Sequence, residues 1–479
     1  MPINLKTLTV KKAHEHLVRG DFSVAELSDA YLKEAKKKNG ELNAYLEIFD
    51  DIPAQAKHAQ KIVDERKEGA PLLCGIPIAV KDNILIEGKI ASSASRILEN
   101  YRATYDATVI KKLKDEGVVF LGRTNMDEFA MGGSTENSAF GSTKNPLDTS
   151  RVPGGSSGGS AVAVAMDGAL LSLGSDTGGS IRQPAAFCGL VGLKPTYGSV
   201  SRYGLMAMAS SLDQIGPFGK TVDDVEVLFN AIKGHDSMDS TSTPDSLMDE
   251  KEKNVKDLTI GVPKDIIDMP GIDADVLLNF KDMIERLKKE GHSIKEISLP
   301  NLRFTLATYY ILMPAEVSTN LARFDGVRYG LSLKGKTPFE DYAKTRGEGF
   351  GREVRRRILL GTYVLSSGYY DAYYNKAWSL RAKIGKDFED AFEDVDIIVT
   401  PTTPTPAFKI GEKSSDPLEM YLADVFTVPA NLIGIPALTV PSGFVDREGE
   451  KLPVGFQMMA PHYHEGNLFN LGRNIYKGS

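Results

Sequence analysis

Gly154-Gly-Ser-Ser-Gly-Gly-Ser160 and Asp176-Thr-Gly-Gly-Ser-Ile-Arg-Gln183 are the two segments that decide how this chain of 479 residues folds. They lie within residues 151–204, which hold 12 of the 45 glycines of the chain. Glycine at this density costs conformational entropy, so a fold keeps it where the backbone takes a positive φ or closely approaches another group. The apolar residues 161–173 join the two segments, whereas a flexible linker would not alternate with apolar runs. We therefore expect two tight loops within a folded core.

Loops of this kind either bind phosphate or present backbone N–H groups to a developing oxyanion. Neither segment has the dinucleotide pattern or the Walker lysine pattern. A formal Walker match occurs at Gly330-Leu-Ser-Leu-Lys-Gly-Lys-Thr337, but the charged residues 323–329 precede it, where a nucleotide-binding loop would follow a buried strand. We interpret that match as fortuitous and favour the oxyanion role, with Ser180 as the nucleophile.

A serine nucleophile needs a base, and the usual partner is histidine. None of the histidines follows an apolar strand or lies among the glycines; they are His14, His16, His58, His235, His292, His462 and His464. Lys81 is the other candidate, because it directly follows the apolar residues 76–80. Desolvation would lower its pKa from about 10.4 and leave a neutral amine that accepts a proton. The alternative is a lysine that extends from the end of a strand into solvent.

The composition is that of an ordinary soluble globular protein, since 42% of the residues are hydrophobic and 25% are charged. The net charge of −7 argues against a large nucleic-acid footprint on this chain alone, which would need a basic face. No apolar run approaches the roughly 18 residues that cross a bilayer, and residues 1–20 lack the apolar block of a signal peptide. Two cysteines, Cys74 and Cys188, are too few for a disulfide framework and wrongly spaced for zinc. We expect a cytoplasmic protein with no metal site and no membrane contact.

Helical and strand patterns alternate along the chain, which predicts an α/β architecture. Ser23-Val-Ala-Glu26 is a capping box that opens a helix to about residue 38, where lysines suit its negative end. The other expected elements are helices at 106–117, 221–233 and 274–290, and strands at 76–80, 118–121, 258–262, 294–297, 396–400, 437–440 and 454–458. Residues 236–256 are polar, as in a long surface loop. Strands on both sides of them favour one large sheet over two independent domains.

Lys81, residues 154–160 and residues 174–189 together resemble the amidase signature family, whose catalytic unit is a lysine and two serines. The resemblance implies a Ser-Ser-Lys triad in which Ser180 becomes acylated, Ser156 is the bridging serine and Lys81 is the terminal base. The oxyanion hole that it implies is formed by the backbone N–H groups of Thr177, Gly178, Gly179 and Ser180.

The resemblance extends over nearly the whole chain, so it also implies how the chain is organised. We expect one amidase domain over residues 1–479, built on one large mixed β-sheet covered by helices on both faces. The signature core lies at about 70–220, the polar excursion at about 236–256 and the portion that completes the substrate site at about 257–479.

Five further segments resemble the A subunits of tRNA-dependent glutamine amidotransferases within this family: residues 123–132, 194–198, 210–217, 320–326 and 366–374. The resemblance implies a glutaminase that supplies ammonia to a partner B subunit. That partner is expected to use ATP and Mg²⁺ to activate the glutamate (or aspartate) on mischarged tRNA. A small C subunit is expected to complete a heterotrimer, and no cofactor is expected in this chain itself.

The charge of the substrate separates this hypothesis from a stand-alone amidase acting on a small neutral amide. Free glutamine is a zwitterion, so its site needs a guanidinium for the α-carboxylate and an anion for the α-ammonium. By resemblance, Arg357 is the carboxylate clamp and Asp424 the ammonium partner, and Tyr310 (or Tyr309) lines the site. Three more arginines lie beside the expected clamp: Arg352, Arg355 and Arg356. Such a run is also compatible with a solvated helix face, so which arginine points inward stays open.

Overall fold

The strand that ends at Lys81 lies near the centre of the parallel part of the sheet. The computed structural model of the chain describes residues 3–248, 252–267, 271–413 and 417–478. Strand β2 (Pro77–Lys81) lies between β3 (Val119–Thr124) and β4 (Leu171–Asp176) and runs parallel to both. Every residue of β2 and β4 is buried. Continuous burial of this kind is typical of parallel strands that are covered on both faces.

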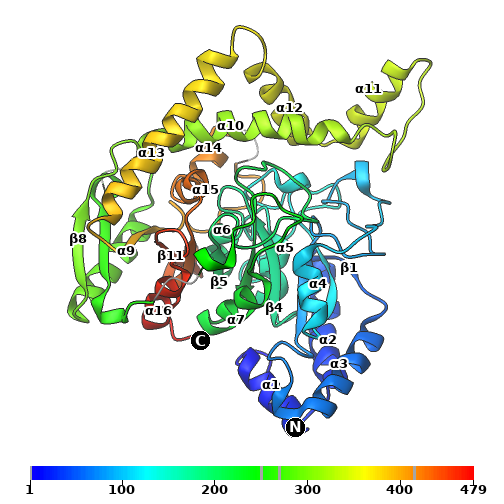
Figure 1. The fold of residues 1–479 in the computed structure, drawn as a ribbon, viewed down its shortest axis with the longest axis vertical. Helices are drawn as coiled ribbons and strands as arrows, with labels where there is room; N and C mark the ends of the chain where they lie inside the picture. The colour runs from blue at the N-terminus through cyan, green and yellow to red at the C-terminus, as the bar shows by residue number, and fades with distance from the viewer. Residues whose placement is uncertain (1–2, 249–251, 268–270, 414–416, 479) are drawn as a thin grey trace.

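The strands of the described residues form one 11-stranded sheet in the order β1-β3-β2-β4-β6-β5-β10-β11-β9-β7-β8 (Figure 1). The remaining strands are β1 (Tyr45–Ile48), β5 (Val191–Lys194), β6 (Gln214–Gly219), β7 (Thr259–Pro263), β8 (Ser293–Ile297), β9 (Ile397–Pro401), β10 (Ala437–Arg447) and β11 (Glu450–Met459). The sheet is mixed, because β7 is parallel to β8 and β9 whereas β10 and β11 are antiparallel. β5 pairs with β10, so strands from both sides of the polar residues 236–256 are neighbours. The expected α/β fold class with one large mixed sheet is confirmed.

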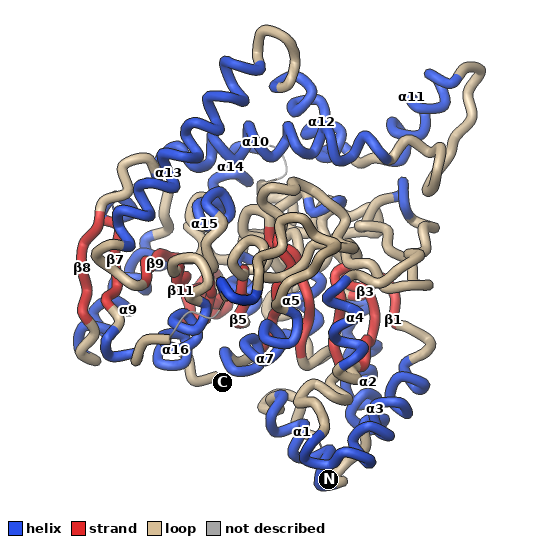
Figure 2. The backbone as a smooth tube through the Cα atoms, in the orientation of Figure 1, coloured by secondary structure: helices blue, strands red, loops and turns tan. Residues whose placement is uncertain are grey.

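The helices of the described residues alternate with these strands along the chain (Figure 2). They are α1 (Val10–Arg19), α2 (Val24–Leu42), α3 (Ile52–Arg66), α4 (Thr108–Asp115), α5 (Gly158–Ala165), α6 (Arg182–Cys188), α7 (Val222–Ile232), α8 (Lys264–Ile267), α9 (Ala274–Lys289), α10 (Thr305–Asn320), α11 (Pro338–Gly349), α12 (Arg352–Val364), α13 (Lys376–Phe392), α14 (Pro417–Leu422), α15 (Val428–Ile433) and α16 (Glu465–Ile475).

Helices cover both faces of the sheet, and β11 shows this most directly. A Cβ atom at Gly455 would lie 2.6 Å from Ala186 of α6. The ring of the next residue, Phe456, stacks on Phe280 of α9 with the centroids 5.6 Å apart. Because successive side chains of a strand point to opposite faces, α6 and α9 lie on opposite sides of the sheet.

A group of long helices lies over one edge of this arrangement (Figure 1). α10 packs against α12 and α13, whereas α11 projects away from the body of the protein. The sequence did not predict these helices. Buried residues occur around most of α10, so it has no single apolar stripe, and Pro314 interrupts its pattern. This layer matters for function because α10 carries Tyr309 and Tyr310 and α12 carries Arg357.

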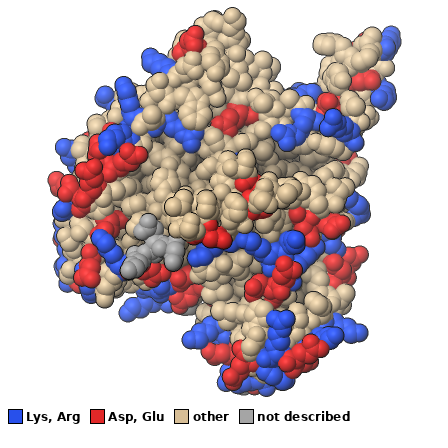
Figure 3. All heavy atoms as spheres, viewed as in Figure 1, with Lys and Arg blue, Asp and Glu red and all other residues tan. Residues whose placement is uncertain are grey.

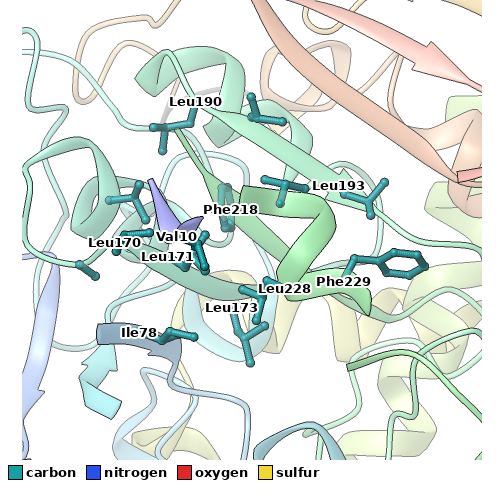
Figure 4. Close-up of a cluster of buried hydrophobic side chains, with 14 of the residues drawn as sticks. Val10, Ile78, Leu170, Leu171, Leu173, Leu190, Leu193, Phe218, Leu228 and Phe229 are labelled. Carbon is teal, nitrogen blue, oxygen red and sulfur yellow. The ribbon is translucent and has the colours of Figure 1, made fainter. Parts of the chain in front are cut away.

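The main hydrophobic core packs the central strands against helices from distant parts of the chain (Figure 4). Val10 of α1, Ile78 of β2, Leu171 of β4, Phe218 of β6 and Phe229 of α7 belong to this one cluster. Close packing of this kind tolerates little displacement. The ends of β2 and β4, where Lys81 and the Ser180 turn begin, are therefore fixed in position.

Most expected elements are present, with ends shifted by a few residues. The capping box of Ser23 and Glu26 is confirmed, and its helix continues to Leu42 instead of ending near residue 38. β5 and β6 were not predicted, because both contain glycine and β6 also contains proline, residues that have low strand propensity. Of the polar residues 236–256, positions 249–251 lie outside the described part of the chain.

On the face shown in Figure 3, acidic and basic side chains are interspersed and neither sign forms a large continuous patch. Among the described helices, none combines the length and the apolar character that crossing a membrane would require.

Replacing Ser23 with alanine is expected to lower the free energy of unfolding by about 1 kcal/mol, because it removes the oxygen that accepts the Glu26 amide at 3.1 Å. Ser379→Ala, in an exposed position of α13, is the matched control. It is expected not to lower the free energy of unfolding, because alanine has a higher helix propensity than serine. Equilibrium urea unfolding of the full chain measures both changes. An unfolding midpoint of Ser23→Ala equal to that of the parent would contradict the prediction.

Candidate active site

The side chain of Lys81 is fully buried among serine hydroxyl groups. Its Nζ lies 2.8 Å from Ser156 Oγ, 2.8 Å from Ser157 Oγ and 2.9 Å from Ser175 Oγ. Burial lowers the pKa of Lys81 to about 7, and nearby carboxylates oppose this shift only in part. Much of the amine is therefore neutral at neutral pH, as a proton acceptor requires. The alternative of a lysine that extends into solvent is wrong for this residue.

Ser156 and Ser180 lie on two loops that are hydrogen-bonded to each other. The backbone N–H of Ser157 donates to the carbonyl oxygen of Ser180 at 3.2 Å. Ser156 is completely buried, whereas Ser180 keeps 8% of its surface exposed. The structure thus brings the loops of both serines to the end of the strand that carries Lys81, and of the two serines only Ser180 has exposed surface.

Close backbone approach explains two of the glycines in these loops. A Cβ atom at Gly155 would lie 2.2 Å from Asp127 Oδ2. Gly179 has a φ of +129°, and a Cβ atom there would lie 2.3 Å from Thr427 Oγ1. A side chain at either position would separate the loop from its neighbour, so glycine is required at both.

A buried ion pair fixes the turn that carries Ser180. Arg182 and Asp176 are both fully buried, with Nη2 and Oδ1 3.0 Å apart. Burial alone would raise the pKa of Asp176, but the charge and hydrogen bonds of Arg182 hold it well below its usual range. Arg182 also donates to the carbonyl oxygen of Thr427 at 2.8 Å and to Gln457 Oε1 at 2.7 Å. Such complete pairing is what makes a buried charge tolerable.

One of the four expected oxyanion donors, the backbone N–H of Gly179, already has an acceptor in this structure. The backbone N–H of Gly179 donates to Asp176 Oδ1 at 2.8 Å, because the carboxylate is turned toward the loop by Arg182. Within the described residues, the backbone N–H groups of Thr177, Gly178 and Ser180 have no such acceptor. These three remain the predicted donors.

Arg357 is the inward-pointing member of the arginine run on α12. It is 4% exposed, and its guanidinium lies over the ring of Tyr310 at 5.8 Å. Nε donates to Glu353 Oε1 at 2.6 Å. Burial alone would lower the pKa of Arg357, but Glu353 and the neighbouring tyrosines raise it, so the guanidinium stays charged. Arg355 is exposed, and Arg356 binds Glu353 and the hydroxyl of Tyr421.

Asp424 is linked to Tyr310 and, through Thr427, to the Ser180 turn. Tyr310 Oη donates to Asp424 Oδ2 at 2.8 Å, and burial raises the pKa of Asp424 to about 7. A Cβ atom at Gly178 would lie 2.6 Å from Tyr309 Oη, so Tyr309 contacts the turn itself. The structure therefore brings Arg357, Asp424 and both tyrosines together beside the two serine loops.

The Walker-like residues 330–337 do not form a phosphate-binding loop. In the described residues, the element directly before them is a short 3-10 helix at Leu321–Arg323 and not a strand, and the helix that follows begins only at Pro338. Gly335 and Lys336 donate their backbone N–H groups to Asp341 Oδ1 at 2.5 Å and Glu340 Oε2 at 2.6 Å. Carboxylates already occupy the amides that a phosphate would need. In the described residues, no group of three or more His, Cys, Asp or Glu is placed to hold a metal ion.

The sequence reasoning did not identify every contact of this site. Ser157 and Ser175 both contact Lys81. Ser157 lies in the first glycine-rich segment and Ser175 directly before the second, but the pattern does not say which hydroxyl faces the amine. Glu353 pairs with Arg357 at the i, i+4 spacing, which is a usable signal on a helix. Nothing in the sequence pattern singles out Gln183, whose side chain is fully buried.

The chain belongs to the amidase family, because the family model described as Amidase matches residues 26–469. The resemblance drawn from the lysine and the two serine loops is thereby confirmed. The family defines a class of enzymes that hydrolyse amide bonds.

Similar sequences and structures point to one branch of that family. The chain is 50% identical to the A subunit of the glutamyl-tRNA(Gln) amidotransferase of Koribacter versatilis over 99% of this chain and 98% of that protein. It is 52% identical to the A subunit from Thermodesulfovibrio yellowstonii over 95% and 93% of the two chains. The crystal structure of the A subunit from Thermotoga maritima matches with a TM-score of 0.81 and 40% identity over 100% and 96% of the chains. The peptide amidase of Stenotrophomonas maltophilia has a TM-score of 0.83 and 26% identity over 99% and 98%.

Amide hydrolysis by this chain is expected to increase with pH through the pKa of Lys81. Because that pKa is lowered to about 7, the ammonium form, which cannot accept a proton, prevails below pH 7 and the neutral amine above it. The measurement is kcat at saturating substrate from about pH 5.5 to 9. Ionisation of Asp424 would act mainly on KM, so kcat is the quantity to follow. Lys81→Arg is the control, because its guanidinium stays protonated, and a flat profile of the parent would contradict the prediction.

Proposed function

We propose that this chain is the glutaminase subunit of a tRNA-dependent amidotransferase and hydrolyses the side-chain amide of glutamine. The observation that carries the proposal is the fully buried amine of Lys81, 2.8 Å from the hydroxyl of Ser156, on a loop hydrogen-bonded to the Ser180 turn. Relatives named as the A subunit of glutamyl-tRNA(Gln) amidotransferase, matched over nearly their full length, support it.

In the proposed reaction, neutral Lys81 takes the proton of the Ser156 hydroxyl while Ser156 takes that of Ser180. The Ser180 oxygen attacks the carbonyl carbon of the glutamine carboxamide and forms a tetrahedral intermediate. The proton returns along the same path to the nitrogen, the C–N bond breaks and ammonia leaves. Water then attacks the γ-glutamyl ester by the same relay, which releases glutamate and restores Ser180. This sequence needs no cofactor in the chain.

The oxyanion of each tetrahedral intermediate is proposed to bind the backbone N–H groups of Thr177, Gly178 and Ser180. A preorganised donor of this kind contributes roughly 3 kcal/mol to stabilisation of the transition state. The Gly179 amide contributes indirectly, since its bond to Asp176 holds the turn in shape.

Recognition of glutamine is proposed to depend on the two charges beside Tyr310. The buried guanidinium of Arg357 would bind the α-carboxylate, and Asp424 would bind the α-ammonium. Tyr310 touches both groups, through its ring and its hydroxyl. A site for a neutral amide would not need a buried cation and an anion that both contact one tyrosine.

The ammonia is proposed to serve a partner. A B subunit would activate glutamate on mischarged tRNA(Gln) with ATP and Mg²⁺, and aspartate on tRNA(Asn) is a second candidate substrate for it. A C subunit would complete the heterotrimer, and the complex would work in the cytoplasm. We further propose that residues 1–479 act as one amidase domain, since both halves of the chain contribute neighbouring strands and site residues.

Ser180→Ala is expected to reduce glutamine hydrolysis by about 10³-fold or more, because no oxygen remains to form the ester. Ammonia release by the purified chain, with any subunits that copurify, measures the loss. Rapid quenching and mass spectrometry should find a γ-glutamyl group on Ser180 of the parent only. Ser138→Ala, on a loop away from Lys81, is the control, and retained turnover by Ser180→Ala would refute the assignment.

Arg357→Met is expected to raise the KM for glutamine by about tenfold or more, since a charged hydrogen bond to the carboxylate is lost. Arg355→Met is the matched control on the same helix, because Arg355 is exposed and should leave KM unchanged. Steady-state kinetics with glutamine measure both. An unchanged KM in Arg357→Met, together with rapid turnover of a neutral amide, would favour a stand-alone amidase instead.

A further inference from the structure

The side chain of Gln183 links the two serine loops. Gln183 lies in the first turn of α6, three residues after Ser180, and is fully buried. Its Oε1 accepts a hydrogen bond from the backbone N–H of Gly155 at 2.8 Å, directly before Ser156 in the chain. An N–H donor requires an acceptor, so this contact fixes which end of the carboxamide is oxygen. The orientation of the Gln183 amide is therefore determined.

The other end of that carboxamide is a buried donor without an acceptor. Within the described residues, Nε2 of Gln183 has no hydrogen-bond partner. An unsatisfied buried N–H group destabilises the folded state, so buried polar groups are nearly always paired. A protein keeps such a group where a ligand supplies the missing partner or where it accepts the loss in stability.

The surroundings of Gly133 show which groups lie near Nε2 of Gln183. A Cβ atom at Gly133 would lie 3.4 Å from Nε2 of Gln183, 3.4 Å from Sδ of Met420 and 3.9 Å from Oδ1 of Asp424. The unpaired donor and a carboxylate oxygen of Asp424 therefore both lie within 4 Å of the position that a side chain at Gly133 would take. The backbone of Gly133 does not itself require glycine, since its φ is not in the left-handed region.

We propose that Nε2 of Gln183 donates a hydrogen bond to an α-carboxylate oxygen of the substrate and so helps to select an amino acid amide. This inference rests on the proposed function, because it takes Asp424 as the partner of the α-ammonium. In an α-amino acid, the ammonium nitrogen and the carboxylate oxygens are no more than two bonds from their shared carbon. A donor next to Asp424 is placed to bind such an oxygen, while Arg357, whose guanidinium lies over the ring of Tyr310, binds the carboxylate as well. Gln183 thus acts on Ser156 through one atom and on the substrate through the other.

The decisive experiment compares glutamine with 4-aminobutanamide, which is glutamine without its α-carboxylate. Gln183→Met also removes the acceptor of the Gly155 amide, so kcat is expected to fall alike for both compounds. The specific effect is expected as a further loss of about tenfold in kcat/KM for glutamine relative to 4-aminobutanamide, mainly through KM. If 4-aminobutanamide is not turned over, its inhibition constant against glutamine replaces kcat/KM. Equal losses with both compounds would overturn the inference and leave Gln183 only a role in holding the Ser156 loop.

Gln183→Glu separates the two ends of the side chain. It keeps an oxygen for the Gly155 amide but replaces the Nε2 donor with a second oxygen. When the new acid carries its proton it donates a hydrogen bond, and when it is ionised it repels the α-carboxylate. The ratio of the KM for glutamine in Gln183→Glu to the KM in the parent is therefore expected to increase with pH. A pH dependence of KM identical to that of the parent would count against the proposal.

Gly133→Ala tests the region itself. The added methyl group would make ordinary contacts with Gln183 and Met420 and would occupy the place proposed for the α-carbon groups of glutamine. KM for glutamine is expected to rise while the thermal midpoint stays unchanged. Gly347→Ala, where a Cβ atom meets nothing within 4 Å, is the matched control. If the parent does not hydrolyse glutamine, the proposed function is refuted. If the parent hydrolyses glutamine and Gln183→Met and Gly133→Ala have the same KM as the parent, only this inference is refuted.

Discussion

The desolvation of one amine governs the chemistry of this protein. Lys81 is fully buried at the end of β2, where its nitrogen meets serine hydroxyls instead of a carboxylate. Three carboxylates lie close enough to favour the charged form, but none of them is a direct partner. Asp176 is held by Arg182, and Asp127 accepts backbone N–H groups of its own loop. Burial therefore prevails, and the pKa near 7 allows the amine both to accept a proton and to return it.

The serine loops depend on the same principle that buried polar groups must be paired. The carboxylate of Asp176 binds Arg182 and also the backbone of the Ser180 turn. Arg182 in turn reaches Thr427 and Gln457, which come from the C-terminal part of the chain. Ser180, the proposed nucleophile, is thus positioned by residues that are distant in the sequence. A pairing network of this kind leaves few donors free, which is why one expected oxyanion amide is already occupied.

The residues of the proposed substrate site lie outside the sheet. Arg357 and the two tyrosines come from helices that lie over the sheet, and Asp424 comes from the loop before α15. Tyr310 connects them, since its ring faces the guanidinium and its hydroxyl binds the carboxylate. Family members of similar fold, such as a peptide amidase, act on other amides. Specificity in this chain is therefore expected to reside in these helices and not in the geometry of the catalytic loops.

The sequence by itself determined the α/β class, the strand before Lys81 and the capping box of Ser23, because these features are local patterns of apolar residues and spacing. The triad of Lys81, Ser156 and Ser180 stays a prediction that rests on family resemblance. Only the tertiary structure decided which arginine of α12 faces inward, because arginines occur around much of that helix and burial selects among them. It also decided that the Gly179 amide binds Asp176 and that Gln183 presents an unpaired donor beside Asp424. These outcomes depend on the direction of individual bonds at contacts between distant segments, and no periodicity in the sequence encodes that direction.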